Sequence, residues 1–256
     1  MLKLLRSLLF ALFMGLIFLP FTGFVGISFW MGLRQRYDFV TRWNSRYTLA
    51  ALRYLAGIRY RVIGRENLPG EPVVILAKHQ STWETLAFAD FLPPSAYVAK
   101  RELLRIPFFG WGMSRMPVVI IDRSGGKDAL RQVVEQGQAM MAQGYSVVVF
   151  PEGTRTPIGS QRRYKIGGAT LAVAAGCKVL PIAHNAGEFW RRGAFIMHPG
   201  EIVVSVGPAI ETAGRTPEEV NAEAEAWIEG EMRRLFPHHY QRRNGSVASV
   251  AEAVRG

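Results

Sequence analysis

An uncharged, largely apolar segment near the start of the chain limits the possible folds more than any other feature of the sequence. No residue between Arg6 and Arg34 carries a charge. This run of about 27 residues exceeds the roughly 20 that a helix needs to cross a bilayer. A cleaved signal peptide is the alternative, because Lys3 and Arg6 provide a basic start. The run is too long for one, however, and no small-residue cleavage site precedes Arg34. The sequence therefore predicts a segment that contacts a membrane.

The composition of this segment leaves open whether it crosses the membrane. Pro20, Thr22 and Gly23 interrupt its middle, and basic residues lie on both sides of it. The next segment, 36–55, combines apolar residues at helical spacing with arginines on the opposite face. Such a helix lies either at the headgroup level of a membrane or with one face on a protein core. Its periodicity fits both arrangements.

The net charge of +11 is concentrated in the first quarter of the chain. Residues 1–66 contain ten lysines and arginines and only two acidic residues. Positive charge around an apolar segment is what attraction to anionic lipid headgroups requires. A nucleic-acid-binding protein would carry its basic residues in a recognition module of the folded domain, and we find no such module in the sequence. We therefore expect membrane phospholipid as a partner and no nucleic acid.

The chain contains one cysteine, Cys177. A single cysteine excludes an intramolecular disulfide and a zinc site built from several cysteines. Because it follows the small residues 174–176, we expect a buried small side chain rather than a nucleophile.

From about residue 58 onward, short β-rich apolar runs alternate with helical patterns, which is typical of an α/β fold with a largely parallel sheet and surrounding helices. The expected strands are 59–63, 73–77, 96–99, 118–121, 146–150, 178–183 and 201–206. The expected helices are 82–91, 108–115, 127–143, 168–175 and 217–235. We divide the chain into N-terminal membrane-anchoring helices (1–57), an α/β domain (58–236) and a flexible tail (237–256). In this tail, His238 and His239 are expected to be solvated.

The polar segment after the strand 73–77 contains the first candidate site. It reads Lys-His-Gln-Ser-Thr-Trp-Glu over residues 78–84, and α/β sheets place their sites at such strand ends. His79 can take a proton from an attacking hydroxyl near neutral pH, and a carboxylate on its other ring nitrogen would fix the tautomer. Glu84 follows five positions later, so a turn and one helical turn can fold it back onto the ring. The alternative is an ordinary helix-capping arrangement.

Two further polar clusters follow expected strands. The segment Phe-Pro-Glu-Gly-Thr-Arg at 150–155 brings Glu152 and Arg155 close to a glycine turn. Arginine offers a planar fork suited to phosphate, and Glu152 can accept a hydrogen bond from a substrate hydroxyl. A surface turn with a local ion pair is the alternative. The segment Lys-Arg-Glu-Leu at 100–103 has cations that either contact an anionic headgroup or belong to a solvated loop.

These segments together resemble the glycerolipid acyltransferase family that acylates 1-acyl-glycerol 3-phosphate. The family's His-x-x-x-x-Asp motif corresponds to His79 through Glu84, and its Phe-Pro-Glu-Gly-Thr-Arg motif is present unaltered. Its remaining elements, Lys-x-Glu-Leu, Pro-x-x-Gly, Ile-Asp-Arg and Val-x-Pro-hydrophobic, correspond to residues 100–103, 107–110, 121–123 and 179–182. The resemblance covers residues 60–210. It departs at Glu84, where the family has aspartate, and the extra methylene moves the carboxylate by roughly 1.5 Å unless the backbone compensates.

The resemblance implies that residues 58–236 form an acyltransferase domain. This domain would move a fatty acyl chain from acyl-CoA or acyl-ACP to the sn-2 hydroxyl of 1-acyl-glycerol 3-phosphate, giving phosphatidic acid. His79 would be the general base and Glu84 its partner, with no metal and no cofactor besides the acyl donor as co-substrate. The substrate-binding residues would be Lys100, Glu152, Gly153, Thr154 and Arg155.

Several alternatives remain beside this hypothesis. Another lysophospholipid or a lyso-aminolipid is an alternative acceptor, and a non-catalytic protein that binds lipid at the membrane surface is an alternative of another class. A serine hydrolase is disfavoured, because no Gly-x-Ser-x-Gly elbow is present and Ser81 is better suited to capping a helix.

The expected location is the cytoplasmic face of the inner membrane, where acyl-CoA and acyl carrier protein are found. The arginines after residue 33 agree with this orientation, because basic flanks remain on the cytoplasmic side. A full span would place Lys3 and Arg6 outside, against the same rule. We therefore expect the apolar segment to bend at residues 20–23 and to dip into the inner leaflet.

Overall fold

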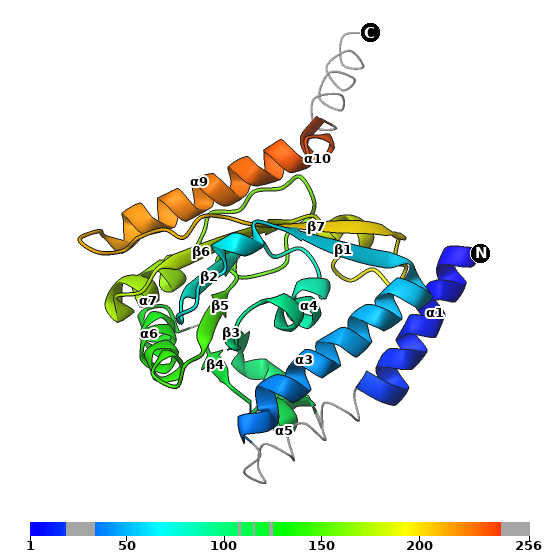
Figure 1. Ribbon diagram of the computed structural model, residues 1–256, viewed down its shortest axis with the longest axis horizontal. Helices are drawn as coiled ribbons and strands as arrows, with labels where there is room; N and C mark the ends of the chain where they lie inside the picture. The colour runs from blue at the N-terminus through cyan, green and yellow to red at the C-terminus, as the bar shows by residue number, and fades with distance from the viewer. Residues whose placement is uncertain (19–33, 107–108, 115, 123–124, 242–256) are drawn as a thin grey trace.

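A seven-stranded sheet forms the centre of the computed structural model, which describes residues 1–18, 34–106, 109–114, 116–122 and 125–241 (Figure 1). The strand order is β1-β7-β6-β2-β5-β3-β4. Neighbouring strands are parallel except for β6 and β7, so β1 and β7 run opposite to the other five. The strands are β1 Ile58–Ile63, β2 Val74–Ala77, β3 Ser95–Lys100, β4 Val118–Ile121, β5 Ser146–Val149, β6 Val179–His184 and β7 Gly200–Val206.

The predicted α/β fold with a largely parallel sheet is therefore confirmed, and all seven expected strands lie within one residue of their predicted bounds. The central strands explain why the prediction worked. Every residue of β2 and of β5 is buried. Strands covered on both faces read as continuous apolar runs rather than as alternating ones, and the sequences Val-Ile-Leu-Ala and Ser-Val-Val-Val follow that pattern.

Helices cover both faces of the sheet and divide the apolar interior into two cores. One core lies between the sheet and α1, α4 and the turn 52–56, and the other lies between the sheet and α6, α7 and α9. The helices are α1 Leu2–Phe13, α3 Arg34–Ala51, α4 Trp83–Phe91, α5 Phe109–Met113, α6 Lys127–Met141, α7 Gly167–Ala175, α8 Ala186–Phe189, α9 Pro217–Leu235 and α10 His238–Gln241. Short π turns at Met14–Phe18 and Leu52–Ala56 and 3-10 turns at Arg65–Asn67 and Arg101–Arg105 complete the described structure.

The start of α9 shows the local chemistry that the sequence predicts. The Thr216 hydroxyl accepts a hydrogen bond from the Glu219 N–H, and the Glu219 carboxylate accepts one from the Thr216 N–H. Pro217 occupies the first helical position, where its missing N–H costs nothing. These contacts fix the point at which α9 begins, and the helix then runs along one face of the sheet (Figure 1).

Helix α1 packs on the protein by one face and exposes leucines on the other. Phe10 is buried and meets the Trp190 ring edge-on, and the Ser7 hydroxyl accepts a hydrogen bond from the Met197 N–H. Among the described residues, no helix combines the length and the apolar composition that a bilayer crossing requires. The expected bend at 20–23 lies outside the described residues. The exposed apolar side chains of this region are Met1, Leu2, Leu4, Leu5, Leu8, Leu9, Leu12, Leu16 and Ile17.

Helix α3 packs on the protein by one face, as one of the two expected arrangements requires. Its Ser45 hydroxyl donates to the Leu86 carbonyl of α4 at 2.6 Å, and Arg46 pairs with Asp90 at 3.0 Å. Trp43 and Tyr47 are exposed. One face of the helix therefore lies on the protein, while aromatic side chains of another remain outside.

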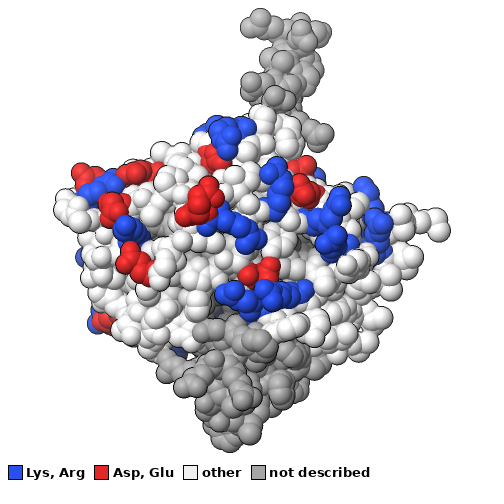
Figure 2. Space-filling view, in the orientation of Figure 1, with Lys and Arg blue, Asp and Glu red and all other residues white. Residues whose placement is uncertain are grey.

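Basic side chains gather on the surface over β1 and the adjoining end of α3, with acidic side chains among them (Figure 2). Arg61 of β1 pairs with Glu201 of β7 at 3.0 Å, and both side chains are about half exposed. The charge that the sequence concentrates in residues 1–66 is therefore partly balanced by acidic residues from later in the chain.

The prediction for the end of the chain was wrong for His239. Its side chain is only 2% exposed, and its Nε2 lies 3.0 Å from a carboxylate oxygen of Glu188 in α8. The neighbouring His238 is more than half exposed. After Pro237 the chain forms α10 and returns to the body, a contact between residues about 50 positions apart that no local pattern reveals. The rest of the expected tail, 242–256, lies outside the described residues.

Candidate active site

The predicted polar segments meet at one edge of the sheet. Strand β2 lies between β5 and β6, and all three run in the same direction. Their carboxyl ends therefore lie side by side, which brings together the segments that follow them. His79 comes two residues after β2, Glu152 three residues after β5, and His184 is the last residue of β6. Strand β3 is the other neighbour of β5 and ends at Lys100 on the same edge.

The structure pairs His79 with Glu84. The Nδ1 atom of His79 lies 2.9 Å from Oε1 of Glu84, which stands in the first turn of α4. Because an ionised carboxylate can only accept, Nδ1 carries the hydrogen and Nε2 keeps its lone pair. The imidazole stacks on the Phe150 ring, with centroids 4.0 Å apart, and its side chain is 15% exposed. Among the described residues no hydrogen bond engages Nε2, so this atom remains available to act as a general base.

The Glu84 carboxylate is buried and bound chiefly through one oxygen. Besides His79, its Oε1 accepts hydrogen bonds from the backbone N–H groups of Gln80 and Ser81, each at 2.8 Å. Burial acts to raise the pKa of Glu84, but His184, His79 and the Ser81 N–H outweigh it and hold the pKa below its ordinary value. The longer side chain at this position thus still reaches the ring and stays ionised.

The turn that carries Glu84 is closed by Ser81. Its side chain is fully buried, and its hydroxyl accepts a hydrogen bond from the Trp83 N–H at 3.1 Å. The cap residue of α4 is Thr82 rather than Ser81, so Ser81 supports the turn just before the helix. This contact leaves the hydroxyl out of reach of a substrate and disfavours Ser81 as a nucleophile.

A second histidine, His184, lies in the interior behind the pair, and sequence reasoning did not single it out. Its Nε2 lies 2.8 Å from the Lys78 carbonyl oxygen, and its Nδ1 accepts from the Ala186 N–H at 3.2 Å. One nitrogen donates and the other accepts, which requires the neutral ring. Burial lowers the pKa of His184 below its ordinary value and agrees with this state. Both nitrogens are used by the backbone, so His184 supports the loop and has none left for a substrate.

Glu152 is buried, and protein groups surround its carboxylate. Lys78 Nζ lies 2.7 Å from Oε1, and the Thr156 hydroxyl donates to the same oxygen at 2.9 Å. The His79 N–H donates to Oε2 at 2.7 Å. The structure thus gives both oxygens of Glu152 partners within the protein. The role in substrate binding that the resemblance implies for Glu152 stays a prediction.

The next residues of this loop reach outward. Gly153 has φ +71°, and a Cβ there would stand 3.1 Å from Cε of Lys165, so glycine suits this turn on two counts. Thr154 is partly exposed. Arg155 is also partly exposed, and its Nη1 donates to the Thr82 hydroxyl at 2.6 Å, next to the start of α4. Lys100 is exposed at the end of β3. Pro107 and Arg123 of the remaining motif lie outside the described residues.

One group of side chains in the described part of the chain has the composition of a metal site. Glu188, His238 and His239 bring a carboxylate oxygen and two ring nitrogens within 4.8 Å of one another. Glu188 Oε2 lies 3.3 Å from Nε2 of His238 and 3.0 Å from Nε2 of His239, so hydrogen bonds account for the grouping. These residues belong to α8 and α10 rather than to the loops that hold His79.

Comparison with known proteins bears on the family and on the fold. A sequence model of the family described as Acyltransferase matches residues 59–185, which include all three segments that carry the candidate residues. A solved structure of the 1-acyl-sn-glycerophosphate (LPA) acyltransferase from Thermotoga maritima has the same fold, with a TM-score of 0.77 at 24% identity. The alignment covers 91% of this chain and 95% of that one.

Curated relatives establish the relationship in sequence. The chain is 46% identical over 207 residues to the 1-acyl-sn-glycerol-3-phosphate acyltransferase of Pseudomonas aeruginosa, with 80% of each chain covered. It is 35% identical over 183 residues to the human 1-acyl-sn-glycerol-3-phosphate acyltransferase alpha, covering 70% of this chain and 65% of the human one. With this identity over four fifths of a relative's length, the chain belongs to the 1-acyl-sn-glycerol-3-phosphate acyltransferase family.

Proposed function

We propose that this protein transfers a fatty acyl chain from acyl-CoA or acyl-ACP to the sn-2 hydroxyl of 1-acyl-glycerol 3-phosphate, which yields phosphatidic acid. The observation that carries the proposal is the pair of His79 and Glu84 at the carboxyl edge of the sheet, with Nδ1 held by the carboxylate and the side chain partly exposed. Membership of the family supports the same reaction, because the relatives in Pseudomonas aeruginosa and human bear the name of this enzyme.

The proposed mechanism is direct transfer without an acyl-enzyme intermediate. Nε2 of His79 takes the proton of the acceptor hydroxyl as its oxygen attacks the thioester carbonyl carbon. The resulting tetrahedral intermediate collapses, the carbon–sulfur bond breaks, and the imidazolium returns the proton to the leaving sulfur. Glu84 stabilises the charged imidazole between these steps. A thioester is already a good electrophile, so the protein chiefly supplies position and a base.

Arg155, Lys100 and the turn at Gly153 and Thr154 are the proposed contacts of the acceptor. Arg155 stands close to the start of α4, where backbone N–H groups also favour negative charge. A guanidinium has five N–H donors, and the hydrogen bond to Thr82 uses one of them. We propose that Arg155 and Lys100 bind the phosphate of the lysolipid and that Gly153 and Thr154 form the wall beside it.

We also propose that the protein works on the cytoplasmic face of the inner membrane. The leucines exposed along α1 support contact with a membrane, because a water-soluble surface rarely exposes such a continuous apolar row. Cysteines placed at Lys3 and at Gln35, in a Cys177→Ser background, can be probed in intact cells with an impermeant thiol reagent. We expect neither position to react. Labelling at position 3 would contradict the bend of the apolar segment, and labelling at position 35 would contradict the cytoplasmic location.

The decisive test of the reaction is an assay of the purified protein over a panel of lysolipid acceptors with both donor types. We expect phosphatidic acid from 1-acyl-glycerol 3-phosphate, with faster turnover than for lysolipids that carry another headgroup. Faster acylation of another lysophospholipid or of a lyso-aminolipid would mean that this lipid, and not 1-acyl-glycerol 3-phosphate, is the acceptor. Lipid binding without turnover would favour the non-catalytic alternative.

A further inference from the structure

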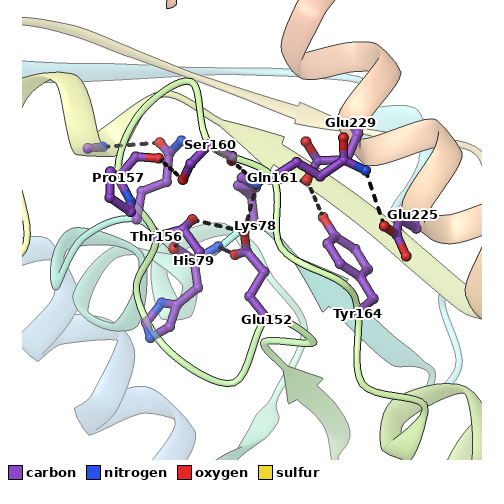
Figure 3. A network of polar contacts seen from close by, with 12 residues as sticks. Lys78, His79, Glu152, Thr156, Pro157, Ser160, Gln161, Tyr164, Glu225 and Glu229 are labelled. Atoms are coloured by element: carbon purple, nitrogen blue, oxygen red, sulfur yellow. Dashed lines mark hydrogen bonds and ion pairs between the residues drawn. The ribbon is translucent and has the colours of Figure 1, made fainter.

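A buried ionic network that no sequence motif predicted lies next to His79. Lys78 is fully buried, and its Nζ lies 2.7 Å from Oε1 of Glu152 and 2.7 Å from Oε1 of Glu229 in α9. It also donates to the Ser160 carbonyl oxygen at 3.3 Å. The three hydrogens of the ammonium therefore have three acceptors. The network joins the end of β2, the loop after β5 and α9 (Figure 3).

The network holds the backbone of His79 on both sides. The His79 N–H donates to Oε2 of Glu152 at 2.7 Å, and the His79 carbonyl oxygen accepts from the Thr156 N–H at 2.8 Å. The Thr156 hydroxyl lies 3.1 Å from the same carbonyl oxygen and 2.9 Å from Oε1 of Glu152. Figure 3 shows the imidazole of His79 pointing away from these contacts. The network thus fixes the peptide groups of His79 and leaves its ring to Glu84 and a substrate.

The charges of the network explain why its members depend on one another. Burial acts to lower the pKa of Lys78, but Glu152 and Glu229 outweigh it and raise the pKa above its ordinary value. Lys78 therefore remains an ammonium. Burial raises the pKa of Glu152, and the ion pair with Lys78 offsets this only in part. Removing one partner would leave a buried charge unpaired, which is more costly than the pair itself is stabilising.

We propose that Glu152 is a positioning residue that holds His79 through its backbone, with Lys78 and Thr156 as its supports, and that it makes no contact with the acceptor. This assignment rests on the proposed function of His79. In it, the glutamate of the Phe-Pro-Glu-Gly-Thr-Arg segment positions the general base and does not bind the substrate. Displacement of a catalytic group by about 1 Å can cost on the order of 10²-fold in rate, so such a support has a kinetic consequence.

The test is Glu152→Gln in the full-length enzyme. An amide nearly matches the carboxylate in shape, but it is neutral and can offer only one acceptor oxygen to three donors. We expect kcat to fall about tenfold and the acceptor KM to change by less than about twofold. Glu201→Gln, at an exposed ion pair of β7, is the matched control.

Other outcomes would overturn the proposal. An acceptor KM raised about tenfold or more with kcat retained would place Glu152 against the substrate. Should Glu152→Gln not fold, Thr156→Val serves instead, because it exchanges only the hydroxyl for a methyl group. We then expect a smaller fall in kcat with the same constant KM, and a raised KM would again contradict the positioning role.

A readout that does not depend on turnover separates this proposal from the proposed function. Amide hydrogen exchange in the peptide 78–84 should be faster in Glu152→Gln than in the wild type, because the His79 N–H loses its charged acceptor. Unchanged exchange would contradict the positioning role even in an active enzyme. If exchange is faster in the variant but the protein acylates no lysolipid, the contact between Glu152 and the His79 N–H is supported. Only the proposed function is then refuted.

Discussion

Polar side chains lie deep inside the molecule behind His79, whereas apolar side chains lie exposed along α1. Lys78, Glu84, Glu152 and Glu229 are buried almost completely, although charged residues rarely are unless paired. The leucines of α1 are about half exposed. Both regions depart from the usual distribution of side chains, and in opposite directions. The buried charges fit a site that must hold a base in place, and the exposed leucines fit a surface that meets lipid.

The two regions also differ in the kind of interaction on which each depends. The interior network depends on distances near 3 Å between particular atoms, so one substitution disturbs several contacts. The apolar face of α1 depends on area, which many leucines share. Single substitutions should therefore affect catalysis strongly in the first region and membrane binding only gradually in the second. The following experiments test this contrast.

The largest effect is expected for His79→Ala. Removal of the general base should lower kcat by roughly 10²-fold or more. Thermal stability and binding to phospholipid vesicles should remain near the wild-type values, because the ring is partly exposed and lies in neither apolar core. A purified variant with near wild-type turnover would show that another group is the base. Loss of vesicle binding would show that the two regions are not independent.

A smaller loss is expected for Glu84→Gln. The amide can still accept from the ring but cannot balance the imidazolium charge, so kcat should fall by roughly tenfold. Glu84→Asp tests the departure from the family motif. Turnover equal to or above the wild type would mean that the loop tolerates the shorter acid. A Glu84→Ala variant with unchanged kcat would remove the carboxylate from the mechanism.

The exposed face of α1 is tested by the double change Leu5→Ser and Leu8→Ser. Both side chains are about half exposed, so the melting temperature should hardly change. Binding to anionic vesicles, measured by sedimentation, should weaken by about five- to tenfold, because less apolar area enters the lipid. Leu5→Phe with Leu8→Phe is the apolar control and should bind as the wild type does. A stability loss without weaker binding would mean that this face packs on protein.

Arg155→Lys should change the acceptor KM more than kcat. Lysine keeps the charge but loses the planar fork, so we expect the KM for 1-acyl-glycerol 3-phosphate to rise about threefold. The KM for the acyl donor should stay constant in the same titrations. An increase in the donor KM alone would assign Arg155 to the phosphates of the carrier instead.

The smallest effect concerns the pH dependence of stability. The pKa of Glu84 is held below its ordinary value, so its stabilisation is present in full above the unfolded pKa of about 4.5 and is lost as the pH falls through the folded pKa. The difference in melting temperature between the wild type and Glu84→Gln should thus be constant from pH 7 to 5 and narrow below that range. If this difference in melting temperature already narrows between pH 7 and 5.5, the pKa of Glu84 is raised rather than lowered.

The sequence alone determined the fold class, the seven strands, the family and the local pair of His79 and Glu84. These features depend on patterns within a few residues: continuous apolar runs for buried strands, and five positions between an imidazole and a carboxylate that one turn can close. The residues that form each of these features are close together in the sequence, so local chemistry strongly restricts how they lie relative to one another. Sequence resemblance then extended this reading to the loop at 152–155.

Only the tertiary structure decided which partners Glu152 has. It meets His79 across 73 positions of the chain, and Lys78 meets Glu229 across 151. Lysine after an apolar strand reads as exposed, and a glutamate within the helix 217–235 reads as one of several surface acids. The sheet order places β2 beside β5, and the path of α9 brings Glu229 above both strand ends. His239 was misassigned for the same reason, because burial and pairing depend on which distant segments meet, and no local pattern contains that information.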